Sequence, residues 1–310
     1  MRREILFELS SPYRDDFRIR GYHFGKGEKA VCIVGATRGN EIQQVYIAGQ
    51  LVKRLKALEQ EGRITQGKEI LIVPSLNPFS MNIGKRFWTQ DNTDINRMFP
   101  GYNLGETTQR IAAGAFEQIK DYNIGIQFAS FYISGDFIPH VRMMKTGLEN
   151  VEMAKDFSMP YVAVREPRPF DTTTLNYNWQ IWETNAFSVY AVDTEKVDME
   201  AAELTIESVL TFLGRQGVIA YEPTITMESV IVEEDEIFNI KTPKAGLFQP
   251  LVKVGESVKA GQPMANVIDP YEGEIIKVLT ASKGGRVFFI QDAPFIQEKT
   301  LAFKMIVEAD

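Results

Sequence analysis

The sequence is poor in the residues that most often build disulfides and metal centres. Its 310 residues include one cysteine and two histidines, so a disulfide within the chain is excluded. The cysteine, Cys32, lies in an apolar run, where a small core residue is the expected role. Because imidazole is the commonest metal ligand, a site that needs two histidines must use both His23 and His140.

Long apolar runs and basic tracts are also missing. No run reaches the roughly 20 apolar residues that span a membrane, and Glu4 and Glu8 interrupt the apolar region that a signal peptide needs. The net charge of −7, without a long basic tract, argues against nucleic acid as a partner. We therefore expect a cytoplasmic protein that binds neither a membrane nor a nucleic acid.

The composition that remains is that of a globular protein, with 44% hydrophobic and 24% charged residues. A chain of this length favours two domains. Strand-like and helix-like segments alternate through residues 1–222, which predicts an α/β domain with a mixed sheet and helices on both faces. Residues 223–310 hold short β-type runs between Gly and Pro, and stretches 243–262 and 282–300 echo each other weakly. They predict a small all-β domain of the barrel-sandwich type.

The central stretch of the first domain is VCIVGATRGNE, residues 31–41. Its apolar part predicts a buried strand, and the apolar spacing after Glu41 predicts a helix over residues 41–58. Arg38, Asn40 and Glu41 then lie on a strand-to-helix turn. Ligands of open α/β sheets bind at that edge.

Further along, the pattern predicts a strand at residues 68–74 that delivers Asn77 and Pro78, and then a polar loop over residues 79–101. A long irregular segment in a compact domain is usually functional or disordered, and apolar anchors in this loop favour function. Later segments predict strands at 180–183 and 188–192 and a helix over 198–216 with Asp198 as its N-cap.

These motifs, in this order, resemble the aspartoacylase/succinylglutamate desuccinylase family of zinc-dependent, carboxypeptidase-like amidohydrolases, and the resemblance covers nearly the whole chain. Four motifs carry it: the G-x-x-H-G-N-E turn, the N-P pair, an arginine followed by D-x-N-R-x-F-P, and the D-L-H-T strand end. They correspond here to Gly35–Glu41, Asn77-Pro78, Arg86 with Asp94–Pro100, and Gly125–Phe128. The resemblance implies a carboxypeptidase-like fold and hydrolysis of N-acyl amino acids.

The departures fall on the zinc ligands. The family holds zinc with two histidines and one glutamate, and of these only the glutamate is kept, as Glu41. Arg38 and Gln127 stand at the histidine positions. Arginine stays protonated and has no lone pair for a metal, and an amide oxygen suits harder cations than zinc. Zinc is thus expected from the family but predicted to be absent here, unless His23 and His140 rebuild the site.

The resemblance also implies roles for the other residues. Arg86 would polarise the scissile carbonyl, Glu183 would be the general base, and Asn77, Asn96 and Arg97 would bind the substrate. A guanidinium fork matches a carboxylate. The alternative is that Arg97 and Asp94 only hold the irregular loop together. Glu183 has an alternative role too, as a polar residue at a strand end.

Arg38 places a fixed cation beside a retained anion. An unpaired buried Glu41 would cost several kcal/mol, so we predict an Arg38–Glu41 ion pair, with help from the Gln127 carbonyl, at the former zinc position. Two functions stay open: an active amidohydrolase, or a metal-free pseudoenzyme that binds a small carboxylated N-acyl amino acid or related ligand through Arg38.

The C-terminal region offers a third function, because its hairpins resemble biotinyl and lipoyl carrier domains. A carrier needs a lysine at a hairpin tip, and the tip at residues 268–273 has none. We expect this region to form the rim of the site or a homo-oligomer interface.

Overall fold

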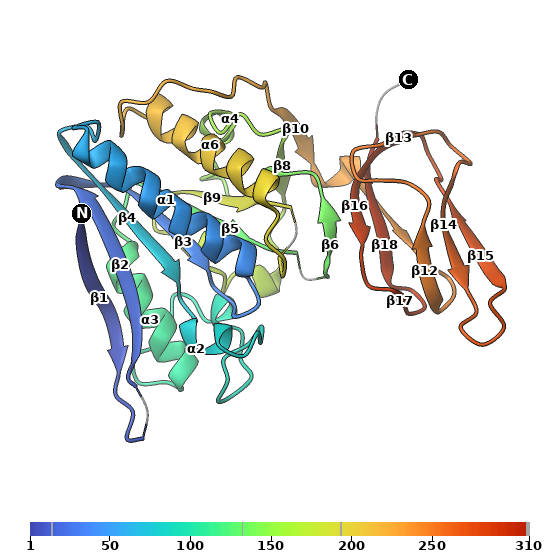
Figure 1. Ribbon diagram of the computed structural model, residues 1–310, viewed down its shortest axis with the longest axis horizontal. Coiled ribbons are helices and arrows are strands. Elements are labelled where there is room, and N and C mark those ends of the chain that lie inside the picture. Colours follow the sequence, from blue (N-terminus) through green and yellow to red (C-terminus); the bar gives the residue numbers. More distant parts are fainter. Residues whose placement is uncertain (14, 132, 193, 308–310) are drawn as a thin grey trace. The chain divides into compact units, whose positions relative to one another are not determined.

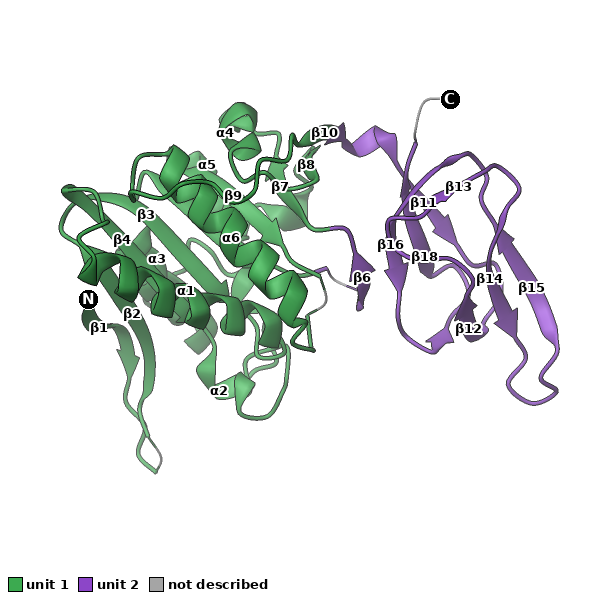
Figure 2. Cartoon of the chain, turned by 45° about the horizontal axis from the view of Figure 1, so that its top comes forward, with its two compact units in different colours: residues 1–130, 139–231 green, residues 131–138, 232–310 purple. Residues whose placement is uncertain are grey.

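The computed structural model describes residues 1–13, 15–131, 133–192 and 194–307. The chain forms two compact units, Met1–Ser130 with Pro139–Ile231, and Phe131–Ile138 with Val232–Asp310 (Figure 2). The domain division after residue 222 stays a prediction. The second unit also takes in a short segment from the middle of the chain.

The first unit is built on a large mixed sheet. Its strand order is β1-β2-β4-β3-β5-β9-β7-β8-β10, and the central β4, β3, β5 and β9 run parallel while β1, β2 and β7 pair antiparallel to their neighbours on the central side. The strand bounds are β1 Arg2–Leu9, β2 Phe17–Gly25, β3 Gly27–Ala36, β4 Gly67–Ser75, β5 Ile124–Ala129, β7 His140–Met144, β8 Tyr161–Arg165, β9 Asn185–Tyr190 and β10 Val230–Glu233.

Helices cover both faces of this sheet, as predicted. Figure 1 shows α1 (Ile42–Gln60) and α6 (Met199–Arg215) side by side on one face, where both contribute to a single apolar core. α3 (Thr107–Ile119) and α5 (Leu175–Ile181) contribute to a second core on the other face. Within the described ranges, no helix combines the length and apolar content that crossing a membrane requires.

Shorter elements complete this unit. They are α2 (Pro78–Met81), α4 (Val151–Lys155) and the 3₁₀ turns η1 (Ile95–Arg97) and η2 (Pro169–Asp171). The predicted strand at 180–183 is wrong, because those residues end α5 and form the turn after it. Trp179 and Gln180 are buried by helical packing, and the Thr174 side chain caps the helix start. Asp198 is the N-cap of α6, as predicted, and accepts from two backbone N–H groups.

The second unit contains two antiparallel sheets. One has the order β11-β18-β16-β13 with β6 also paired to β16, and the other has the order β15-β14-β12-β17. The bounds are β6 Gly135–Phe137, β11 Ile237–Lys241, β12 Gly246–Pro250, β13 Ser257–Val258, β14 Pro263–Ile268, β15 Ile275–Thr280, β16 Gly285–Gln291, β17 Phe295–Ile296 and β18 Leu301–Ile306, with the 3₁₀ turn η3 at Glu234–Glu236. Buried apolar side chains of both sheets form one core. The region is thus all-β apart from one short turn.

The direction of the central strands positions the candidate site. Because β3, β4, β5 and β9 are parallel, the segments that follow them meet at one edge of the sheet. The Leu76 amide, just after β4, donates to the Ala36 carbonyl at the end of β3 (2.8 Å). The Gln43 amide at the start of α1 donates to the Thr194 carbonyl, four residues after β9 (3.2 Å).

Candidate functional site

The centre of this edge is the carboxylate of Glu41, which is completely buried. Oε2 accepts the Thr37 amide (2.7 Å), the Thr37 hydroxyl (3.2 Å) and the Arg38 amide (2.9 Å). Oε1 accepts the Ser130 hydroxyl (2.7 Å) and Nη1 of Arg38 (3.0 Å). The turn after β3 therefore folds around its own glutamate, and Ser130, directly after β5, adds a fifth donor.

Arg38 forms the predicted ion pair with Glu41 and a second pair with Asp94. Its Nε lies 2.9 and 3.2 Å from the two Asp94 oxygens, and the whole residue is 4% exposed. Burial disfavours the charged guanidinium, but the two carboxylates outweigh burial, so the pKa of Arg38 is raised. Arg38 is thus a permanent cation between two anions.

The predicted interaction between the Gln127 carbonyl oxygen and Arg38 is wrong. Among the described residues, no hydrogen bond joins the two side chains; Nε2 of Gln127 donates to Oδ1 of Asn96 instead (3.2 Å). The same oxygen accepts the Leu175 amide (3.2 Å), so Asn96 links β5 to the start of α5. Asn96 and Gln127 are both buried and lie beside the Arg38 cluster, because Asp94 caps the turn that carries Asn96 (3.0 Å).

Arg97 and Asn77 make contacts within the protein. Nη1 of Arg97 donates to the Phe170 carbonyl and lies 3.5 Å from Oδ1 of Asp171. Burial alone would raise the pKa of Asp171, but the Arg168 amide and the guanidinium of Arg165 outweigh it and lower that pKa. Asn77 caps α2 by accepting the amide of Ser80 (3.2 Å). Arg97 is therefore paired within the protein, but with η2 rather than inside its own loop, and Asp94 pairs with Arg38 instead.

The two predicted catalytic residues are placed differently. The backbone carbonyl of Arg86 accepts the Gly39 amide (3.3 Å), so Arg86 lies beside the Arg38 turn. Glu183 is exposed and lies two residues before β9, where Asn185 pairs with Ile124 at the start of β5. That is the sheet edge opposite the Glu41 cluster. The structure therefore does not bring Glu183 to the site.

Three residues contact the turn after β3 although the sequence did not indicate them as its partners. Asp94 was part of a recognised motif but was not matched to Arg38. Ser130 follows β5, and Glu195 follows β9, where it accepts Nδ2 of Asn40 (2.8 Å). Applying the strand-end rule to β9 would have indicated residues 191–195.

The residues of this edge do not fit a zinc ion. Both oxygens of Glu41 already accept donors, Arg38 offers no lone pair, and Gln127 faces Asn96. In the part of the chain that the structure describes, no group of three or more His, Cys, Asp or Glu side chains is arranged to hold a metal.

The two histidines do not rebuild a centre. His23 lies in β2, with its ring nitrogens 3.2 and 3.3 Å from carboxylate oxygens of Glu4 and Glu69. His140 begins β7 and stacks on Tyr190 at 4.7 Å between ring centroids. Four strands of the sheet separate β2 from β7. A relocated two-histidine site is therefore incompatible with this fold.

Comparison with known proteins gives matches of three kinds. A family model described as the succinylglutamate desuccinylase/aspartoacylase catalytic domain matches residues 27–214. The N-alpha-acetyl-L-2,4-diaminobutyric acid deacetylase of Halomonas elongata is 24% identical over 263 residues, which are 79% of this chain and 72% of that protein.

Solved structures agree in fold. A succinylglutamate desuccinylase from Silicibacter sp. TM1040 has a TM-score of 0.83 at 18% identity, over 99% of this chain and 94% of that one. The product-bound ectoine utilization protein EutE (DoeB) of Ruegeria pomeroyi has a TM-score of 0.78 at 18% identity, over 94% and 90% of the two chains. At these identities the likeness concerns the fold alone.

Proposed function

The chain belongs to the succinylglutamate desuccinylase/aspartoacylase family of N-acyl amino acid amidohydrolases. We propose that it binds a small carboxylated ligand without zinc. Arg38 takes the position of the metal in this proposal. The ligand is an N-acyl amino acid or a related carboxylate, and zinc-dependent hydrolysis is lost.

The observation that carries this proposal is the saturation of Glu41. Five donors converge on its two oxygens, and one of them is the guanidinium of Arg38. A metal would have to displace a buried, charged partner, which costs about 3–5 kcal/mol when it leaves an ion unpaired. A metal ion on Glu41 and the guanidinium of Arg38 therefore exclude each other.

A donor remains for the ligand. Among the described residues, none accepts a hydrogen bond from Nη2 of Arg38. Arg86, whose backbone joins the same turn, is the second cation in this proposal. A guanidinium pair of this kind suits the carboxylate and acyl oxygens of the ligand class.

The second candidate is zinc-dependent deacylation, and the similarity to a deacetylase favours it. It requires the Arg38 side chain to move away from Glu41. It also requires the remaining zinc ligands to come from residues of this edge that do not fit zinc. The two candidates therefore make opposite predictions about metal content.

The test combines metal analysis of the purified protein with binding and hydrolysis assays on N-acetyl-aspartate and N-succinyl-glutamate. We expect no stoichiometric zinc, a ligand-dependent rise in Tm and no hydrolysis. Arg38→Met should abolish the rise in Tm, and the double variant Arg38→His, Gln127→His tests whether zinc binding can be restored. Stoichiometric zinc in the wild type, with hydrolysis lost on its removal, would refute the proposal.

We further propose a barrel-sandwich arrangement for the C-terminal β region and a role for it in homo-oligomer formation. A cytoplasmic location, without membrane or nucleic acid partners, stays a prediction.

A further inference from the structure

A cavity with a volume of about 430 Å³ lies beside α3. Its walls come from the loop after η1, from α3 and from the end of α5. We call it the aromatic pocket and define it by six of its lining residues: Tyr102, Leu104, Phe116, Glu117, Lys120 and Trp182. This volume lies in the range of small-molecule sites.

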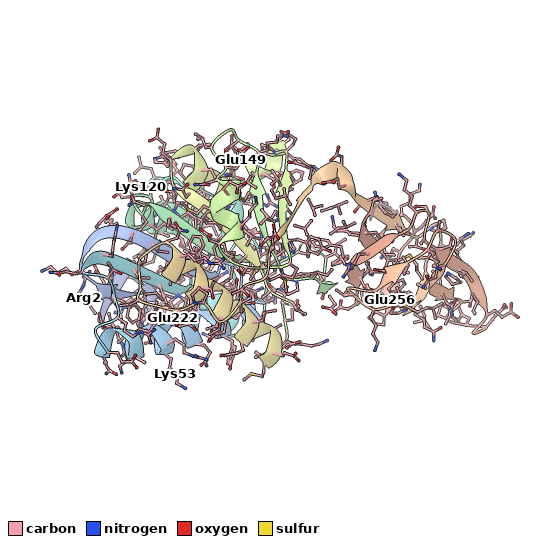
Figure 3. All side chains as sticks on the ribbon, turned by 90° about the horizontal axis from the view of Figure 1, so that it is seen from above. Arg2, Lys53, Lys120, Glu149, Glu222 and Glu256 are labelled. Carbon is pink, nitrogen blue, oxygen red and sulfur yellow. The ribbon has the colours of Figure 1, made fainter. Side chains whose placement is uncertain are left out.

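The aromatic pocket is separate from the Arg38 cluster. Trp182 lies three residues before the start of β9, at the edge where β5 and β9 begin. Lys120 follows the last residue of α3 at the periphery of the first unit (Figure 3). The Arg38 cluster lies at the opposite edge, after the end of β3. The family site therefore does not account for this pocket.

The apolar wall of the pocket is packed against α3 and yet faces water. Trp182 packs edge-on against Phe116, with 5.3 Å between ring centroids and 90° between ring planes. The Trp182 amide closes α5 on the carbonyls of Asn178 and Trp179, both at 3.1 Å. Even so, Trp182 is 45% exposed, and Tyr102 and Leu104 are 56% and 83% exposed. A gathering of exposed apolar side chains around one cavity is typical of a binding site.

The rim of the pocket carries one charge of each sign. Nζ of Lys120, the residue directly after α3, lies 2.8 Å from Oε2 of Glu117 in the last turn of that helix. Both side chains are partly exposed, at 28% and 57% respectively. An exposed pair of this kind contributes little to stability, so it can open to admit a ligand. A ligand with a single charge would satisfy one of these groups and strand the other.

We propose that the aromatic pocket binds a free α-amino acid with an apolar side chain, such as leucine. The ligand ammonium pairs with Glu117, the ligand carboxylate pairs with Lys120, and the side chain packs against Trp182 and Leu104. The zwitterion carries its two charges on one carbon, which matches the adjacent charges of the rim. The amino acid is thus an effector or second ligand, bound away from the family site.

Tryptophan fluorescence tests this directly on the wild-type protein. The sequence has three tryptophans; Trp88 and Trp179 are at most 1% exposed, so acrylamide quenches mainly Trp182. We expect L-leucine to protect this fluorescence with a Kd of about 1 mM. The acid 4-methylpentanoate and the amine 3-methylbutylamine, each with one charge, should bind about tenfold more weakly.

Exchanging the rim charges separates recognition from a structural role. Glu117→Gln should weaken leucine binding about tenfold without changing binding of the acid, and Lys120→Gln should spare the amine in the same way. Glu152→Gln is the matched control, because Glu152 forms a similar pair with Lys155 on α4, and it should leave leucine binding unchanged.

Three results would overturn the proposal. They are no protection by leucine at any concentration, equal protection by leucine, acid and amine, and protection that grows with protein concentration alone. The second would mean an apolar patch without charge recognition. The third would mean an interface between two copies of the chain.

Discussion

Replacing Arg38 by methionine tests whether the buried ion pairs hold the candidate site together. The change removes the Nη1 bond to Glu41 and the Nε bonds to Asp94 while keeping much of the side-chain volume. Hydrogen bonds to charged groups contribute about 1.5–3 kcal/mol each, and breaking a buried pair costs about 3–5 kcal/mol. Glu41 keeps four other donors, so we expect the low end of that range, about 3 kcal/mol of unfolding free energy.

Urea unfolding followed by tryptophan fluorescence measures this loss, because Trp88, Trp179 and Trp182 all lie in the first unit. With a slope of about 3 kcal/mol/M, the midpoint should fall by about 1 M. The matched control is Arg54→Met, since Arg54 pairs on the surface with Glu203. It should change the stability by less than about 1 kcal/mol.

A double-mutant cycle isolates the pair itself. Glu41→Gln alone should also destabilise, because an amide nitrogen would then face the donors of the turn. The loss in the double variant Arg38→Met, Glu41→Gln should be smaller than the sum of the two losses by about 2 kcal/mol. Additive losses, or an Arg38→Met midpoint within about 0.3 M of the wild type, would refute the reasoning.

Three further predictions follow from burial and charge. In urea unfolding, Gly35→Ala should destabilise the protein by about 1–3 kcal/mol, because the added Cβ would lie 2.2 Å from the Pro74 carbonyl oxygen. Gly49→Ala should instead stabilise it by about 0.5 kcal/mol, because Gly49 is an exposed helix position with open space around it. Equal effects of the two changes would contradict this reasoning. Burial raises the pKa of the Cys32 thiol well above its usual value, so a thiol reagent should label the protein only as it unfolds in urea, and rapid labelling of the folded protein would contradict the burial. The lowered pKa of Asp171 stabilises the folded state at any pH above about 3.9, the pKa of an aspartate in the unfolded chain. That contribution is lost as the pH falls through the lower pKa of the folded state. The Asp171→Asn variant should therefore be less stable than wild type at neutral pH, with a difference that shrinks below about pH 4, and a pH-independent difference would mean that the charge plays no part.

Local patterns were enough to predict the elements around the site. Apolar runs and spacings predicted β3, α1 and β4. The cost of leaving a buried Glu41 unpaired predicted its ion pair with Arg38, three residues away on the same turn. These features depend on residues close in the chain, for which period and turn chemistry are good guides. The polar loop over residues 79–101 was predicted to be functional because it is long and irregular yet carries apolar anchors, and it supplies Asp94 to the Arg38 cluster.

What the tertiary structure alone decided is which distant groups meet. Asp94 contacts Arg38 from 56 residues further along the chain, and Ser130 contacts Glu41 from 89 residues further along. No local sequence pattern encodes these contacts. Glu183 lies at the opposite edge because it precedes β9 by two residues, and β9 runs parallel to β5. Sequence periodicity fixes which faces of an element are buried, but strand direction and order in the sheet decide which ends come together, since those depend on the packing of the whole unit.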